Sequence, residues 1–173
     1  MKQLVRALSG LLLVASTLGC AQTHAKGPAP IVHCDVTNED FCFALPSGAT
    51  SMLSIPVDFK LYEVLLPNRQ KILVYYGSQP DYPEQAPEFS EASGTEKISL
   101  FRQTLAGRER IDAFYEKERE KFTMVVHVQA SSDEATKASV VEFLASMRKC
   151  ASEQKGSIMC TSEPLFAKVA EQL

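Results

Sequence analysis

The chain of 173 residues has no tryptophan, only three histidines and only five cysteines. It contains no G-x-S-x-G nucleophile motif, no H-E-x-x-H zinc motif and no phosphate-binding loop. Each of these motifs places a reactive group in a fixed local geometry, so the sequence gives no support for the enzyme classes that they mark. The lack of a C-x-x-C pair likewise argues against thiol redox catalysis. We therefore predict no catalytic residue, no bound metal and no cofactor, although carboxylates distant in sequence can still meet in space.

An apolar stretch near the start of the chain is too short to cross a membrane. It runs from Ala7 to Leu18, about twelve residues where a transmembrane helix needs roughly 20. Lys2 and Arg6 precede it and small residues follow it, which is the layout of a secretory signal peptide. The sequence therefore predicts an exported protein whose signal peptide occupies residues 1–19.

The signal ends in Thr17-Leu18-Gly19-Cys20. Small residues before a cysteine resemble the end of a bacterial lipoprotein signal, although leucine is usual where Thr17 stands and here follows one place later. The resemblance implies that Cys20 carries palmitate or another acyl chain, and Ala21 in place of an aspartate favours an outer-membrane lipoprotein facing the periplasm. The alternative is an ordinary signal cleaved after Ala25, which would give a soluble periplasmic or secreted protein.

The rest of the chain has the size of one domain. Residues 20–31 are small, polar and proline-containing, as expected of a flexible tether, and residues 32–173 form a single globular domain. Removing Lys2 and Arg6 from the 18 basic residues leaves 16 against 21 acidic ones, a net charge of −5. No basic patch indicates binding to nucleic acid or to an anionic membrane surface.

Four cysteines remain after either processing route, and they fall into two local pairs. Cys34 lies near Cys42, and Cys150 lies near Cys160. Three connectivities are possible, and an exported protein oxidises its thiols. Structural zinc ligands are usually spaced more closely than these pairs. We predict two short-loop disulfides, Cys34–Cys42 and Cys150–Cys160, each contributing roughly 2.5 kcal/mol to stability.

Alternation of apolar and polar residues predicts strands within 51–66, 71–76, 97–107 and 123–130. Segment 108–122 fits both a strand and a helix, and segment 77–94 is predicted to be a long loop. A capping box from Ser131 to Glu134 predicts a helix over residues 131–150, and a short final helix is expected from about Pro164 to Leu173. The predicted fold class is α+β, an antiparallel meander of about four to five strands covered by the C-terminal amphipathic helix.

The histidines and the first acidic cluster are expected to have structural roles. His33 adjoins Cys34 in a loop, and His127 is expected to be half-exposed on a strand face, not a ligand or a base. Asp35, Glu39 and Asp40 are expected to form a solvated turn, because the segment lacks the ligand spacing of a calcium loop.

The least ordinary segment is a loop rich in aromatic residues and proline. Long loops in compact domains are often functional, and rigid aromatic residues make good binding anchors. The predicted partner-binding residues are Tyr75, Tyr76, Pro80, Tyr82, Pro83 and Phe89. Alternatively, Tyr75 or Tyr76 packs in the core and the remaining residues cover a sheet edge.

Three functions are compatible with this sequence. The first is a non-catalytic module that binds an envelope protein, as an assembly accessory or as a factor that neutralises a toxin in the periplasm. The second is a carrier of an apolar small molecule between sheet and helix, which would need a cavity of about 300 Å³. The third is a hydrolase using carboxylates. We favour the protein-binding module, because the sequence shows no catalytic motif.

Overall fold

The computed structural model describes residues 33–153 and 156–173. The architecture is mainly β, with 51% of the described residues in strands and 10% in helices, and this corrects the predicted α+β class. The larger sheet is antiparallel and holds, in spatial order, β3 (Thr50–Ser54), β4 (Lys60–Leu65), β5 (Lys71–Gly77), β9 (Thr123–Ser132), β8 (Arg108–Glu118), β7 (Glu96–Leu105) and β6 (Phe89–Ser93). The smaller sheet holds β1 (Val36–Thr37), β2 (Phe41–Phe43), β10 (Arg148–Ser152) and β11 (Ile158–Pro164).

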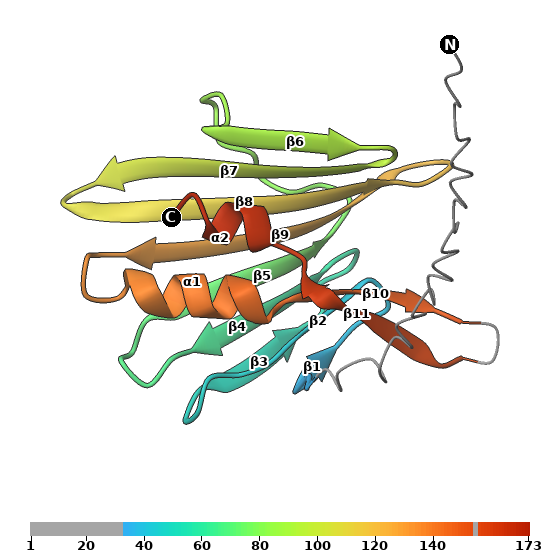
Figure 1. Cartoon of the computed structure of the whole chain (residues 1–173), viewed down its shortest axis with the longest axis horizontal. Helices are drawn as coiled ribbons and strands as arrows, with labels where there is room; N and C mark the ends of the chain where they lie inside the picture. Colours follow the sequence, from blue (N-terminus) through green and yellow to red (C-terminus); the bar gives the residue numbers. More distant parts are fainter. Residues whose placement is uncertain (1–32, 154–155) are drawn as a thin grey trace, which may run out of the picture.

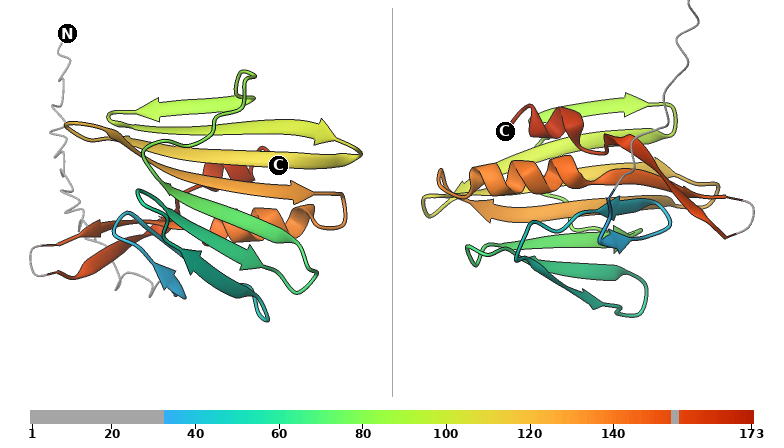
Figure 2. Two further views of the ribbon diagram at one scale, coloured as in Figure 1. Left: turned by 180° about the vertical axis from the view of Figure 1, so that it is seen from behind. Right: turned by 60° about the horizontal axis from the view of Figure 1, so that its bottom comes forward.

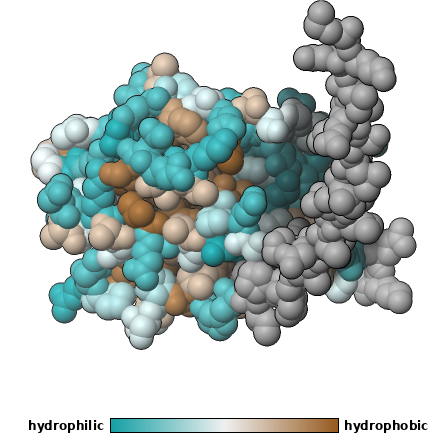
Figure 3. All heavy atoms as spheres, viewed as in Figure 1, coloured by the Kyte–Doolittle hydropathy of each residue, from teal (hydrophilic) through white to brown (hydrophobic). Residues whose placement is uncertain are grey.

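One face of the larger sheet, here called the covered face, carries the smaller sheet and two short helices (Figures 1 and 2). The helices are α1 (Lys137–Ser146) and α2 (Ala167–Ala170). The main core lies between these layers, and Phe43 of β2 meets Phe143 of α1 with ring centroids 5.2 Å apart. Both side chains are fully buried, so truncating either to alanine would cost about 3–5 kcal/mol. Figure 3 shows this side of the molecule, where hydrophilic residues surround a few visible apolar ones.

Several local predictions are confirmed. Residues 67–70 form the turn of the β4–β5 hairpin, in which Leu65 pairs with Lys71. Segments 97–107 and 123–130 contain most of β7 and most of β9. The segment that fitted both a strand and a helix is the long strand β8. Both of its faces are packed, since Tyr115 joins the main core and Phe114 is buried on the opposite face.

The C-terminal part differs from the prediction. Ser131 and Ser132 extend β9 in place of starting a helix, and α1 begins after the N-cap Thr136. Asp133 forms the turn instead, accepting a hydrogen bond from the backbone N–H of Thr136 at 3.0 Å. Residues expected at the end of this helix form β10, which pairs with β2 and β11, and the final helix has four residues. The smaller sheet was missed because its strands come from opposite ends of the domain, and local periodicity cannot report such pairing.

The long predicted loop contains β6 and a crossing segment. Phe89–Ser93 pairs with β7, so residues 78–88 alone connect β5 to β6. Strands β9, β8 and β7 separate those two strands in the sheet, a span of about 19 Å at ~4.8 Å per strand. The segment runs over the face that carries no helix (Figure 2, left). Its length is therefore a requirement of the topology.

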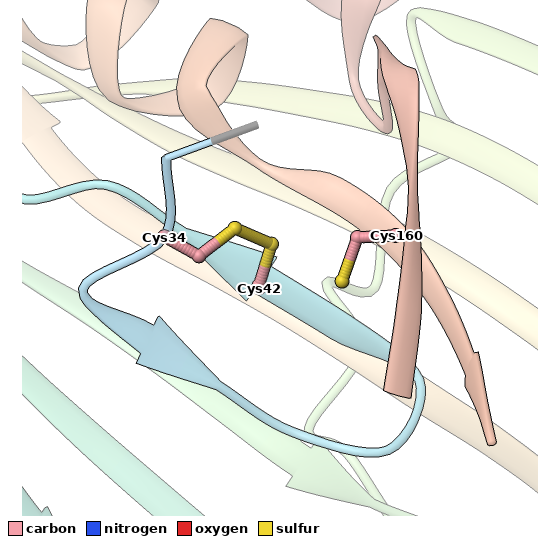
Figure 4. A group of neighbouring side chains, drawn as sticks. All are labelled: Cys34, Cys42 and Cys160. Carbon is pink, nitrogen blue, oxygen red and sulfur yellow. A yellow bond between two sulfur atoms is a disulfide. The ribbon is translucent and has the colours of Figure 1, made fainter. Parts of the chain in front are cut away.

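Both predicted disulfides are confirmed. Cys34 is bonded to Cys42, and Cys150 is bonded to Cys160. The sulfurs of Cys34, Cys42 and Cys160 lie within 4.8 Å of one another, so the two disulfides are neighbours (Figure 4). The first disulfide joins the segment before β1 to β2, and the second joins β10 to β11. Together they cross-link the strands of the smaller sheet.

The predicted signal peptide, the acylation site Cys20 and the tether lie outside the described residues. Within the described ranges, neither helix combines the length and the apolar character needed to cross a bilayer.

Candidate functional site

The second face of the larger sheet, here called the open face, has no helix or second sheet packed on it in the part of the chain that the structure describes (Figure 2, left). Cross-strand partners share a face, so Phe114 on β8 and its partner His127 on β9 both point to this side. A solvated sheet face would normally be polar. Here Phe101, Phe114 and Val125 form a second buried hydrophobic cluster. The side chains of the open face are therefore packed against one another and form a small core of their own.

Three aromatic rings make the most distinctive contact on this face. The ring of Phe114 packs parallel to the imidazole of His127, with centroids 4.0 Å apart, and it also stacks on Tyr82 of the crossing segment at 4.7 Å. Phe101 meets Phe114 edge-on at 5.4 Å. Tyr82 remains 44% exposed. One side of its ring is thus fixed by the sheet while the rest stays accessible.

Hydrogen bonds hold the crossing segment on the sheet. The backbone N–H of Gln79 donates to the hydroxyl of Tyr75 at 3.0 Å, and Nε2 of Gln85 donates to the carbonyl of Arg102 at 2.8 Å. Tyr75 is itself locked, because it packs on Phe59 and lies over Gly77, where an added Cβ would come within 2.5 Å of its hydroxyl. The segment is consequently ordered by contacts at several points along its length.

The six predicted partner-binding residues divide between the two faces. Tyr75 lies on the open face and Tyr82 packs over it, while Pro80 and Pro83 are half-buried in the crossing segment. Tyr76 is buried on the covered face, and Phe89 packs against the main core. The structure therefore groups four of the six residues on the open face, whereas Tyr76 and Phe89 lie on the covered face.

The acidic cluster near Cys42 matches the expected solvated turn only in part, because Asp35 and Glu39 are exposed whereas Asp40 is not. Asp40 is buried and is paired with Lys117, at 3.4 Å, and with Arg119. Its carboxylate and that of Glu39 accept hydrogen bonds from the hydroxyl of Tyr76. Burial and these two carboxylates raise the pKa of Tyr76 far above its usual range. This cluster ties the β1–β2 turn to the larger sheet.

A buried ionic network stands beside the aromatic rings. Asp112 is fully buried and accepts hydrogen bonds from Arg110, at 2.7 and 3.1 Å, from His127 at 2.9 Å and from Gln129 at 3.1 Å. Burial by itself would raise the pKa of Asp112, but the hydrogen bonds from His127, Arg110 and Gln129 lower it below its usual range. The expectation of a half-exposed His127 was wrong, because the side chain is buried between this carboxylate and Phe114.

Sequence reasoning missed this network because its members come from different strands. Asp112, His127 and Gln129 are neighbours only in the register that pairs β8 with β9. One signal was available in the sequence: the charged residue Asp112 stands two positions before Phe114 in a strand-like segment, so both side chains point to the same face. An inward-pointing charge of this kind needs a partner on the next strand.

The network ends in a hollow of about 270 Å³ at the end of the open face. Leu73 and Leu105 contribute apolar wall, and Lys71, Arg110 and Gln129 contribute polar groups. The side chain of Arg110 is 34% exposed while Nε and Nη2 are held by Asp112. Nη1 of Arg110 makes no hydrogen bond to any part of the chain that the structure describes. The hollow thus offers a fixed cation next to apolar side chains, a combination suited to an acidic group with an apolar neighbour.

No protein family, no curated protein and no solved structure matches this chain.

Proposed function

We propose that the protein is an exported, lipid-anchored envelope protein that binds a protein partner through its open face. The partner belongs to the cell envelope or enters it, as an assembly component or a toxin would. The site comprises Tyr82, the exposed edge of Arg110, and the hollow lined by Leu73 and Leu105. The protein acts by holding its partner and not by chemistry.

The observation that carries this proposal is the fixed position of Arg110 at the edge of an apolar hollow. The buried carboxylate of Asp112 orients the guanidinium before any partner arrives, so little side-chain entropy is lost on binding. Arginine and tyrosine are the residue types that most often dominate interface energetics. Tyr82 supplies the tyrosine on the same face, held in place by Phe114.

The two other functions have less support. Phe143 and Leu144 fill the space between α1 and the sheet, where a carrier of apolar ligands would need a cavity. Asp112 is the buried carboxylate of the open face, and its oxygens are occupied by Arg110, His127 and Gln129. A hydrolase would need such a carboxylate free to meet a substrate.

The partner site can be tested by site-specific cross-linking in cells. A photoreactive phenylalanine analogue at Leu105 should give a cross-linked product on illumination, because this side chain is exposed on the rim of the hollow. The same analogue at Ala138, which is exposed on α1, serves as the matched control. Cross-linking from Ala138 and not from Leu105 would place the partner on the covered face and refute the proposal.

The captured partner then allows a quantitative test. Replacing Arg110 with glutamine should weaken its binding by about 2 kcal/mol or more, the usual cost of losing an interface hot spot. Replacing Lys168 with glutamine removes an exposed cation from the covered face and should leave the affinity unchanged. Equal affinities for the wild type and both variants would contradict the assignment of Arg110.

Lipidation is a separate part of the proposal and has its own test. The support is the Gly19-Cys20 ending of the signal and the tether-like composition that follows it. Mass spectrometry of the mature protein should find an acylated N-terminal Cys20. A mature N-terminus at Lys26 would instead establish cleavage of an ordinary signal after Ala25.

A further inference from the structure

Large apolar side chains are exposed toward one end of the domain, in two turns and at the start of strand β11. The β3–β4 turn exposes Ile55 and Val57, the β8–β9 turn exposes Phe122, and the β10–β11 hairpin exposes Ile158 and Met159. Figure 1 shows the β3–β4 turn, the β8–β9 turn and the start of β11 toward the same end of the molecule, on its right side. Exposed turns are normally polar. Two apolar turns at one end, with exposed apolar residues of β11 at the same end, therefore call for an explanation outside the folding of the domain.

The first two of these turns form a continuous surface. A groove of about 410 Å³ is lined by the β3–β4 turn, by Phe122 and by Met124. Val57 is fully exposed and Ile55 is 68% exposed, so neither side chain contributes much to the stability of the domain. Moving both side chains from water into an apolar medium would be favourable, because it removes apolar surface from contact with water.

The chain enters the domain at this end. His33 is the first described residue, and the sulfur of the next residue, Cys34, lies within 4.8 Å of that of Cys160 on β11. Twelve residues separate Cys20 from His33, and an extended segment of that length reaches at most about 45 Å. An acyl group on Cys20 would therefore tether this end of the domain within about 45 Å of the membrane.

We propose that this end docks on the lipid bilayer, with Ile55, Val57 and Phe122 inserted among the acyl chains. The inference rests on the lipidation proposed above and adds a second, protein-made contact with the same membrane. A single acyl chain binds a bilayer only marginally, so an additional apolar contact strengthens attachment and fixes the orientation of the domain.

The charges around the apolar turns favour insertion over electrostatic adsorption. The acidic residues Glu39, Asp58 and Glu120 stand beside the basic residues Lys60, Arg119 and Lys121 at this end, so the two signs balance. Docking should consequently depend little on the fraction of anionic lipid, in contrast to a polybasic surface.

This orientation leaves the proposed partner site free. Strand β5 begins at Lys71, which lines the hollow beside Arg110, and ends at Gly77, which lines the apolar groove. The two sites are thus separated by the length of the strand, about 20 Å. The hollow would face away from the membrane surface.

The absence of tryptophan from the chain permits a direct test. Val57→Trp introduces a single tryptophan at the apolar end, and Leu105→Trp introduces one at the rim of the hollow as the matched control. Each full-length acylated protein is reconstituted into vesicles of phosphatidylethanolamine and phosphatidylglycerol. The emission of the tryptophan at position 57 should shift to shorter wavelength and should be quenched by brominated lipid, whereas the control should show neither change.

A third position provides an independent readout. Phe122→Trp should also be quenched by brominated lipid, and adding Ile55→Asp and Val57→Asp should reduce that quenching to the level of the Leu105→Trp control. These substitutions lie in an exposed turn, and circular dichroism will show that the fold is retained.

Two outcomes would overturn the inference. One is an acylated protein whose tryptophan at position 57 stays solvent-exposed in vesicles. The other is a spectral shift that occurs without lipid and accompanies dimer formation in sedimentation, which would assign the apolar end to a second copy of the chain. Absence of the acyl group by mass spectrometry is a different result: it contradicts the proposed lipidation, and vesicle binding by the unacylated protein would then still report on the apolar end.

Discussion

Arg110 and Asp112, two residues apart on β8, form an ion pair with two hydrogen bonds, from Nε to Oδ2 at 2.7 Å and from Nη2 to Oδ1 at 3.1 Å. Their side chains share the open face because alternate residues of a strand point to the same side. Asp112 is fully buried, whereas about a third of Arg110 is exposed. The pair therefore joins the interior of the face to its surface, and it fixes a cation where a partner can reach it.

Replacing Asp112 with asparagine should reduce the free energy of unfolding by about 2–3 kcal/mol. The substitution leaves Arg110 and His127 without their shared carboxylate, and breaking a buried pair costs about 3–5 kcal/mol when both partners are buried. The partial exposure of Arg110 reduces that cost. Urea unfolding measures the change, with Asp81→Asn in the exposed crossing segment as a control that should remain near the wild type. Equal stability of the two variants would show that the network contributes nothing to folding.

The same carboxylate should make stability sensitive to acid. The pKa of Asp112 is lower in the folded protein than the value of about 3.9 expected when unfolded. A carboxyl of this kind stabilises the fold above its unfolded pKa, and the contribution is lost as the pH falls through the folded pKa. Urea midpoints measured downward from about pH 5 should fall more steeply for the wild type than for Asp112→Asn. Parallel curves would contradict the assignment.

Tyr82 should contribute to stability as well as to binding. Its ring stacks on Phe114 while 44% of the residue stays exposed. Tyr82→Ala is expected to cost about 1–1.5 kcal/mol and to lower the melting temperature by roughly 3–6 °C. Tyr82→Phe keeps the stacked ring and should melt close to the wild type. A melting temperature unaffected by Tyr82→Ala would mean that the crossing segment does not rest on the sheet in solution.

The hydroxyl of Tyr82 offers a spectroscopic check of the same contact. Burial, together with the carboxylate of Glu116, raises its pKa to about 12. The absorbance titration curve of Tyr82→Phe is subtracted from that of the wild type. The difference should show a tyrosine whose pKa lies well above the usual value of about 10. Glu116→Gln should move this titration downward. A difference curve centred near the usual value would contradict the stacked position.

Each disulfide should contribute separately to stability. Replacing both members of the Cys34–Cys42 pair, or of the Cys150–Cys160 pair, with alanine should cost about 2.5 kcal/mol on the chain-entropy account. Cys42 and Cys150 lie in the interior, so alanine is preferred to serine there. A non-reducing peptide map checks the connectivity. A peptide that links Cys34 to Cys150 would refute it.

The strands with short connections were largely predictable, and the layers around them were not. The hairpin turning at residues 67–70 and the strands β7 and β9 follow from alternation and turn chemistry. The α+β class was wrong because the segment after β9 was assigned to one long helix, whereas helix α1 stops at Ser146 and Arg148 and Lys149 pair with β2. At the end of that segment, a tertiary partner from the start of the domain prevailed over local helical spacing.

The candidate site shows the same limit. The loop with Tyr82 was singled out from composition alone, and the structure places Tyr82 on the open face. The companion residues Tyr76 and Phe89 were grouped with it by proximity in sequence, but strand alternation sends them to the other face. The sequence did not identify Arg110 and Asp112 as site residues. Two charged residues in a strand are normally expected to be solvated, and only the neighbouring strand shows that Asp112 is buried.

The sequence by itself determined the two short-range disulfides and the strands that alternate clearly, because each depends on residues that are close along the chain. The tertiary structure decided the smaller sheet, the path of the crossing segment and the network around Asp112. These features depend on which strands become neighbours and in which register. The physical reason is that burial couples residues distant in sequence: whether Asp112 is a surface charge or the centre of a buried network is set by His127 and Gln129 on the next strand.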